Sequence, residues 1–183
     1  MNWRLAAASL LVALGTGTMA RPQPVAEPDG YRGEPYRAPV PATLAGARVI
    51  DASEAIRLHA AGAAVFLDIL PRKARPEGLP ADTVWREPRH ESIPGALWLW
   101  NTGYQRLAPE EEARLRAGLR QVRRDFPGLP VIFFCRSDCW MSWNAAKRAV
   151  EWGELDVIWF PGGIEAWEEA DGPPLVTVTA FDP

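Results

Sequence analysis

Short apolar runs alternate with amphipathic segments along most of the chain. The apolar runs have the character of buried strands and cover 49–50, 63–68, 96–100, 131–134 and 156–160. The segments between them have helical composition and cover 52–61, 109–126, 142–152 and a short stretch after Gly163. This alternation predicts an α/β fold with helices on both faces of a parallel sheet.

Local signals mark the ends of the expected helices. Asp51 precedes the first helix and can cap its free N–H groups, and Gly62 follows that helix. In segment 109–126 the glutamates occupy the first turn and the arginines lie further along, which suits the helix dipole. We interpret these arginines as a solvated face, because the chain as a whole is acidic.

Two proline-rich segments fall outside this pattern. Residues 21–43 contain six prolines and few apolar side chains, so we expect an extended tail or linker, whose Tyr31 and Tyr36 can pack on the domain. Residues 70–92 form a polar loop of unusual length for a compact domain. A loop of this length indicates either a functional segment or a covering flap.

The first 20 residues have the order of a secretory signal peptide. Arg4 is followed by an apolar run at 5–14 and by small residues up to Ala20, after which we expect cleavage. The apolar run is shorter than the roughly 20 residues that span a bilayer, although an uncleaved anchor is an alternative. We therefore expect a signal peptide at 1–20, a tail at 21–43 and one domain at 44–183, exported to the periplasm.

Composition narrows the functional classes. Lys and Arg number 20 against 23 Asp and Glu, which gives a net charge of −3. A nucleic-acid-binding protein would need a basic excess or a basic run, and the chain has neither. Two cysteines and two histidines leave too few ligands for a zinc cluster, so we expect no metal and no cofactor. The two thiols are the main reactive groups, and export to an oxidising compartment favours their pairing.

Cys135 directly follows the apolar run at 131–134 and precedes a helix. In an open α/β sheet, ligands bind beyond the carboxyl ends of the strands. Loop N–H groups, the helix N-terminus and Arg136 would stabilise a thiolate there, so we expect the pKa of Cys135 to fall. The alternative is a buried, inert cysteine, which the polar residues that follow Cys135 disfavour.

Cys139 lies four residues after Cys135, one residue more than in the thioredoxin-type C-x-x-C spacing. Two cysteines so close in a tight loop can meet the Cα separation of ~4.4–6.8 Å that a disulfide requires. The pair is therefore either redox-active or a static bridge. Cysteine phosphatase chemistry is excluded, because Met141 stands where the phosphate-binding arginine of such a loop would lie.

Several segments in combination resemble the rhodanese family. They are the strand ending in Asp68, the stretch His90-Glu91-Ser92-Ile93-Pro94-Gly95-Ala96, the cysteine loop, the Ala-rich helix, and Gly162-Gly163-Ile164-Glu165-Ala166-Trp167. Together they span about residues 49–170. The resemblance implies a three-layer α/β/α fold with a five-stranded parallel sheet. It also implies that Cys135 occupies the position of the cysteine that carries sulfane sulfur as a persulfide.

Residues 135–149 more narrowly resemble a family of exported proteins named for a CXXCW motif and associated with pyrroloquinoline-quinone (PQQ)-dependent catabolism. This resemblance implies a periplasmic protein without a membrane span after signal cleavage. The partners it implies are a sulfur donor or acceptor, a thiol partner, and a periplasmic quinoprotein dehydrogenase or cytochrome.

The resemblance also suggests roles around Cys135. Arg136 and the loop N–H groups would bind an anionic persulfide and the incoming donor. The remaining members of this anion-binding loop are Ser137, Asp138, Trp140 and Met141. Asp138 stands where a glycine is usual, and its charge would raise the thiolate pKa and repel anionic donors. Cys139 would resolve the persulfide, which releases sulfide and forms a disulfide.

The remaining candidate residues near the cysteine loop are Trp140, Trp143, Asp68 and His90. Trp140 and Trp143 share a helix face, where they wall an apolar mouth, dock a partner or belong to the core. Asp68 is expected to orient loop amides near the site. His90 is expected to be structural, and could donate a proton only if loop 70–92 folds over Cys135. Three functions remain open: a sulfur-transfer enzyme, a dithiol–disulfide protein, and a non-catalytic binding module.

Overall fold

The computed structural model describes residues 24–154 and 156–183. The expected signal peptide at 1–20 lies outside the described residues. Within the described part of the chain, no helix is both long enough and apolar enough to span a membrane.

Five parallel strands form the central sheet, in the order β1-β6-β5-β2-β4. Their bounds are Arg48–Val49 for β1, Val65–Asp68 for β2, Leu97–Trp98 for β4, Val131–Phe134 for β5 and Val157–Phe160 for β6. Each falls on or within one residue of a predicted apolar run. The predicted α/β fold with a five-stranded parallel sheet is therefore confirmed.

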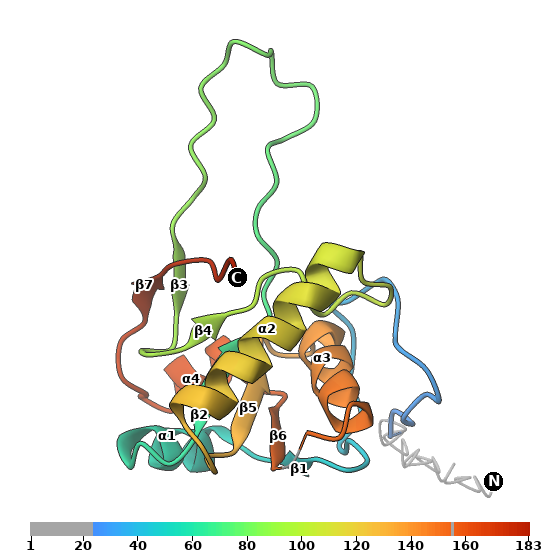
Figure 1. The fold of residues 1–183 in the computed structure, drawn as a ribbon, viewed down its shortest axis with the longest axis vertical. Helices are drawn as coiled ribbons and strands as arrows, with labels where there is room; N and C mark the ends of the chain where they lie inside the picture. Colours follow the sequence, from blue (N-terminus) through green and yellow to red (C-terminus); the bar gives the residue numbers. More distant parts are fainter. Residues whose placement is uncertain (1–23, 155) are drawn as a thin grey trace, which may run out of the picture.

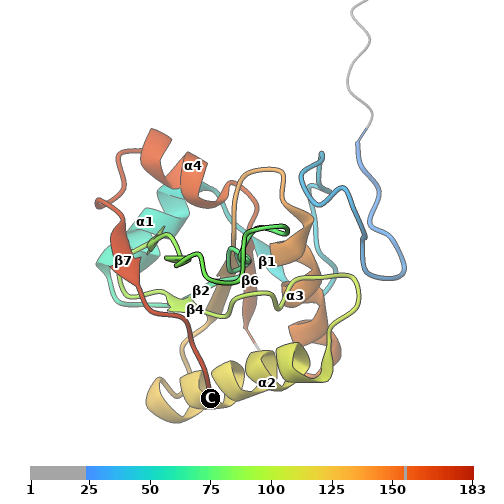
Figure 2. The same cartoon turned by 90° about the horizontal axis from the view of Figure 1, so that it is seen from above.

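Four helices cover the two faces of this sheet (Figures 1 and 2). Helices α1 (Ala52–Ala60) and α4 (Gly163–Glu169) lie on one face, and α2 (Pro109–Asp125) and α3 (Trp140–Glu151) lie on the other. Asp51 caps α1 as expected, since its side chain accepts a hydrogen bond from the Glu54 amide. Helix α3 begins two residues before the predicted start, directly after Cys139.

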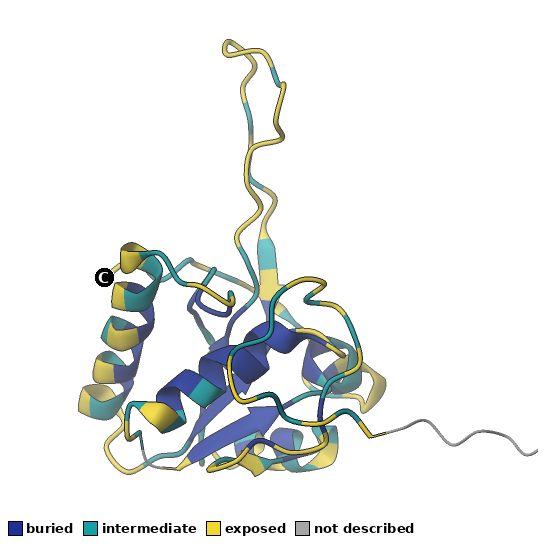
Figure 3. Ribbon diagram, turned by 90° about the vertical axis from the view of Figure 1, so that its right-hand side faces the viewer, coloured by how far each residue is buried: buried dark blue, intermediate teal, exposed yellow. Residues whose placement is uncertain are grey.

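The period of two along each strand divides the core into two layers. Val131 and Phe133 of β5 pack towards α2 and α3, whereas Ile132 and Phe134 pack towards α1 and α4. All four side chains are fully buried. Figure 3 shows the dark blue of buried residues concentrated in the strands and in α3. This packing fixes the carboxyl end of β5, and with it the loop that begins at Cys135.

A second, two-stranded sheet joins β3 (His90–Ser92) to β7 (Val176–Val178) in antiparallel register. Sequence periodicity does not predict either strand, because three residues are too few to show an alternating pattern. The small sheet places His90 beside the carboxyl end of β2.

The structure describes residues 24–43 of the expected tail at 21–43, and we call this part the strap. The Arg32 amide and carbonyl both bond to the Asn144 side chain on α3, each at 2.9 Å. The Trp143 indole donates to the Thr43 carbonyl at 3.2 Å. Tyr36 and Val40 pack against the core. The strap therefore lies against α3 and forms part of the domain.

Residues 71–89, which we call the arm, project far beyond the sheet as an extended loop (Figures 1 and 3). Most of the arm is exposed, and Val84 retains 81% of its accessible surface. Only the base of the arm contacts the domain near the cysteines. Of the two interpretations of loop 70–92, a functional segment or a covering flap, the structure does not show the flap.

Candidate functional site

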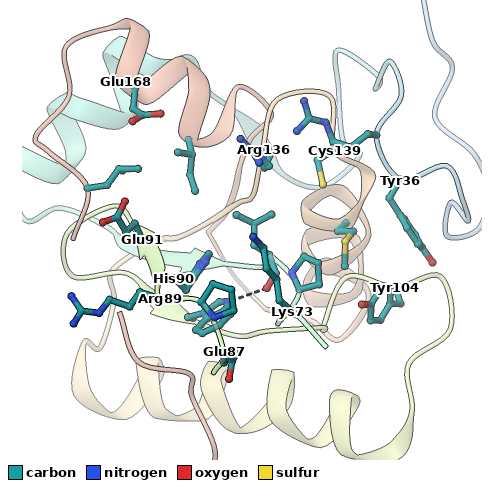
Figure 4. A pocket seen from close by; sticks show the side chains of 18 residues that line it. Tyr36, Lys73, Glu87, Arg89, His90, Glu91, Tyr104, Arg136, Cys139 and Glu168 are labelled. Atoms are coloured by element: carbon teal, nitrogen blue, oxygen red, sulfur yellow. Dashed lines mark hydrogen bonds between the residues drawn. The ribbon is translucent and has the colours of Figure 1, made fainter. Parts of the chain in front are cut away.

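A pocket of about 700 Å³ opens at the carboxyl end of the sheet. Its wall combines the strap, the base of the arm, β3, the cysteine loop and α4 (Figure 4). The Cys139 sulfur points into this pocket, and His90 lies across from it. This location agrees with the rule that ligands bind beyond the carboxyl ends of parallel strands.

Both cysteines lie in the loop between β5 and α3 as free, buried thiols. Cys135 follows β5 and has no exposed surface, whereas Cys139 retains 4% and lines the pocket. The Cys135 thiol lies 3.6 Å from the Cys139 carbonyl oxygen and 3.8 Å from that of Arg136. The sequence left open whether the pair is bridged, and in the structure the two sulfurs are not bonded to each other.

Cys139 has the surroundings of a thiolate. A hydrogen bond from the Cys135 side chain is the largest influence and lowers the pKa of Cys139 to about 7, although burial opposes it. Backbone N–H groups of Met141, Arg136 and Ser142 lower the pKa further. Cys139 occupies the N-cap position of α3, where free N–H groups converge, although its sulfur makes no regular cap hydrogen bond.

The expectation that the pKa of Cys135 falls is wrong. Burial raises the pKa of the Cys135 thiol well above its usual range, and its hydrogen bond to the Cys139 side chain raises it further. Because Cys135 has no exposed surface whereas Cys139 lines the pocket, Cys139 is the thiol that ionises more readily. Sequence position could not separate the two, because the difference comes from tertiary burial and from side-chain direction.

Arg136 was expected to stabilise a Cys135 thiolate, but its side chain contacts Glu165 instead. Its Nε lies 2.6 Å from Oε1 of Glu165 on α4, and the Ser137 amide donates to Oε2 of the same carboxylate at 2.9 Å. The Ser137 hydroxyl donates to the Gly162 carbonyl at 2.6 Å. These contacts tie the cysteine loop to α4 and hold Arg136 at the pocket wall. They also lower the pKa of Glu165 against the opposing effect of burial.

The glycine pair at the start of α4 packs closely against the cysteine loop, because Gly163 has no side chain. It adopts a φ of +55°, and a Cβ there would lie 2.5 Å from the Cys135 carbonyl oxygen. That oxygen accepts a hydrogen bond from the Ile164 amide at 3.0 Å. A side chain at this position would separate the cysteine loop from α4.

Asp138 acts through its backbone rather than through the expected charge. It is exposed and adopts a φ of +51°, a left-handed conformation that Asp tolerates better than most residues. Its carbonyl accepts a hydrogen bond from the Ala38 amide of the strap at 2.9 Å. The main influences on the two thiol pKa values do not include its carboxylate.

Trp140, Met141 and Trp143 are buried, with at most 3% of their surface exposed. The two indoles pack edge to face, with ring centroids 5.4 Å apart. Both tryptophans belong to the core cluster beneath the strap, which agrees with the interpretation of these residues as part of the core. Met141 lies in the same cluster and also lines the pocket.

Asp68 orients neighbouring groups, as expected. Its buried carboxylate accepts hydrogen bonds from the Leu70 amide at 2.8 Å, from the Ser92 hydroxyl at 2.5 Å and from His90 Nε2 at 2.7 Å. His90 stacks on Trp98 with ring centroids 4.0 Å apart. The structure thus holds His90 rigidly at the pocket wall, but the pocket separates it from Cys139 in Figure 4.

Sequence reasoning missed three residues of the pocket region. Tyr36 and Arg37 of the strap line the pocket, and Glu165 binds the cysteine loop. Glu165 could have been found, since it follows the glycine pair at the same sheet edge. The strap residues carried no such signal. Among the described residues, no group of three or more His, Cys, Asp or Glu side chains could hold a metal ion.

Comparison with known proteins gives a family match. The rhodanese-like domain model matches residues 51–170. A solved structure of a protein of unknown function from Rhodopseudomonas palustris, described as a possible tyrosine phosphatase, is 23% identical with a TM-score of 0.43. That match covers 69% of this chain and 83% of the other chain. No curated protein gives a significant match.

Proposed function

The chain belongs to the rhodanese-like domain family, and from this premise we propose that it transfers sulfane sulfur through Cys139, with Cys135 as the second thiol. The observation that carries the proposal is the unequal environment of the two sulfurs. Cys139 lines the pocket and has a lowered pKa, whereas Cys135 is fully buried and has a raised pKa. The proposal gives Cys139 the persulfide-carrying role that the family resemblance implies for Cys135, and it makes Cys135 the resolving thiol.

The first step forms a persulfide on Cys139. Its thiolate attacks the outer sulfur of a donor, the donor S–S bond breaks, and the leaving group departs with the electron pair. The N–H groups that lower the Cys139 pKa stabilise the negative charge on the persulfide. In sulfur transfer, an acceptor thiolate then attacks the outer sulfur and regenerates the Cys139 thiolate.

Cys135 offers a second fate for this persulfide. It loses its proton and attacks the inner sulfur, Sγ of Cys139, so the bond to the outer sulfur breaks and HS⁻ leaves. The two thiols are oxidised to a disulfide, and the transferred sulfur is reduced to sulfide. An external thiol must then reduce the disulfide before the next cycle. The short loop between β5 and α3 favours this route, because it holds both cysteines.

The same dithiol supports exchange with disulfides of partner proteins, and this is the second function that we propose. We further propose that the protein belongs to the exported CXXCW family and works in the periplasm in PQQ-dependent catabolism. A quinoprotein dehydrogenase or a cytochrome is the partner expected there. A non-catalytic module that docks through its tryptophans has less support, since Trp140 and Trp143 are buried.

Intact-mass measurement after incubation with a persulfide donor tests the proposal. The wild type is expected to gain one sulfur atom or to lose two hydrogens through disulfide formation. Cys135→Ser should gain sulfur and retain it, because the resolving thiol is absent. Cys139→Ser should gain none. Sulfur loading of Cys139→Ser at the wild-type rate would contradict the assignment of Cys139 as the nucleophile.

A further inference from the structure

Two tyrosines form an aromatic wall of the pocket. Tyr36 comes from the strap and Tyr104 from the turn between β4 and α2, and their rings pack with centroids 5.6 Å apart and an interplanar angle of 58°. Both side chains line the pocket. Figure 4 shows them on one side of Cys139, with His90 and Glu91 on the other side. The reactive sulfur therefore lies between an aromatic wall and a polar wall.

Backbone contacts hold both tyrosines against the start of α3. The Trp140 amide donates a hydrogen bond to the Tyr36 carbonyl at 2.9 Å. Gly103 packs so closely on Met141 that a Cβ at Gly103 would lie 2.5 Å from the Met141 carbonyl oxygen. This approach places Tyr104 next to Met141, whose side chain also lines the pocket. The fold therefore fixes the aromatic wall beside the cysteine loop.

The polar ends of the two tyrosines already have partners within the protein. The Gln105 amide donates to the Tyr36 hydroxyl at 3.1 Å, and the Tyr104 hydroxyl donates to Oδ1 of Asn101 at 3.4 Å. Both side chains are only half-buried, so part of each ring remains accessible. The surface that they offer to a ligand is therefore mainly the apolar surface of the rings.

The size of the pocket indicates an organic ligand. Its volume of about 700 Å³ lies within the range of roughly 300–1,000 Å³ that is usual for small organic molecules. A small inorganic sulfur anion would fill a minor part of this volume, since one water molecule occupies about 30 Å³. A ligand with sulfur at one end and an aromatic ring at the other would reach both Cys139 and the aromatic wall.

We propose that Tyr36, Tyr104 and Met141 form an aromatic subsite that selects an organic persulfide with an aromatic group as the sulfur donor. The donor ring packs on the two tyrosine rings and on the Met141 thioether, which holds the S–S bond at Cys139. The Cys139 thiolate attacks the outer sulfur, the S–S bond breaks, and the aromatic thiolate leaves with the electron pair. The outer sulfur keeps its proton and becomes the terminal –SH of the Cys139 persulfide. This rests on the proposed role of Cys139 as the nucleophile.

The test compares two neutral reagents that differ by an aromatic group. N-Benzyliodoacetamide and iodoacetamide alkylate the same Cys139 thiolate, so a change in its pKa cancels in the ratio of their rates. Rates are measured at Cys139 by peptide mass spectrometry, and the ratio for glutathione gives the intrinsic reactivity of the reagents. The wild-type ratio is expected to exceed the glutathione ratio about three- to tenfold. Tyr36→Leu and Tyr104→Leu should each lose most of this excess, whereas Tyr36→Phe and Tyr104→Phe, which keep the ring, should retain it.

Tyr31→Leu is the matched control, because Tyr31 also belongs to the strap but packs its ring on the Arg148 guanidinium, 3.8 Å from the ring centroid. Its ratio should equal that of the wild type. A loss as large as that of Tyr36→Leu would show that a loosened strap is the cause and would overturn the subsite. A wild-type ratio equal to that of glutathione would overturn it even if sulfur transfer proceeds. A raised ratio in a protein that takes up no sulfur would support the subsite and overturn the proposed function.

Discussion

The strap and the arm are both long, polar and rich in proline, yet they take opposite positions in the fold. The strap lies against α3 and the cysteine loop, whereas the arm extends away from the sheet (Figure 1). The strap bonds to the domain through Arg32, Tyr36, Ala38 and Thr43. The hydrogen bonds of the outer arm remain within it, as between the Thr83 amide and the Pro80 carbonyl at 3.0 Å.

The difference follows from what each segment can bury. The strap covers Trp140 and Trp143, and its Tyr36 ring packs on Tyr104 with centroids 5.6 Å apart. The outer arm is mostly exposed, and its Val84 retains 81% of its accessible surface. Proline content sets an extended backbone in both segments, but partners elsewhere in the chain decide whether that backbone docks.

The largest loss of stability is expected from a change at Asn144, which holds the strap against α3. Asn144 is fully buried and bonds to the Arg32 amide and carbonyl and to the Gly103 carbonyl, each at 2.9 Å. Asn144→Ala leaves these groups without partners and should lower the free energy of unfolding by about 2–3 kcal/mol. Urea denaturation measures the change. A loss below ~0.5 kcal/mol would show that the strap does not contribute to stability.

A smaller effect is expected at the turn that presents the cysteine loop to the strap. Asp138→Ala forces a residue with Cβ and no polar side chain into a φ of +51° and should cost about 1 kcal/mol. Asp138→Gly fits this conformation and should stay within about 0.5 kcal/mol of the wild type. Equal losses in both variants would mean that the side chain, rather than the backbone conformation, matters there.

The smallest change in stability is expected when the arm is shortened. Replacing residues 74–85 by two glycines removes exposed chain and shortens a loop, so the free energy of unfolding should change by less than about 1 kcal/mol. Thermal or urea unfolding provides the measurement. A loss comparable with that of Asn144→Ala would show that the arm, like the strap, stabilises the domain.

The sequence predicted most strands of the central sheet from continuous apolar runs and the helices from their amphipathic composition and end signals. The short strands β3 and β7 carry no such period. The family resemblance located the cysteine loop and the buried Asp68. The resemblance implied that Cys135 is the reactive cysteine. It could not show that Cys139 is the thiol with the lowered pKa, because the two cysteines differ in burial and not in local sequence. The contribution of Arg37 to the pocket wall was also hidden, since it depends on a pairing between segments 102 residues apart, from 37 to 139.

The most direct test of the account is the pH dependence of alkylation at each cysteine. The structure predicts that Cys139 reacts first with iodoacetamide, with a midpoint near pH 7, because its pKa is lowered to about 7. The thiolate fraction, and with it the rate, rises as the pH increases through this value. Cys135→Ala removes the hydrogen bond from the second thiol and should move the midpoint upwards by about one pH unit. Faster alkylation of Cys135 than of Cys139 at pH 7 would contradict the account.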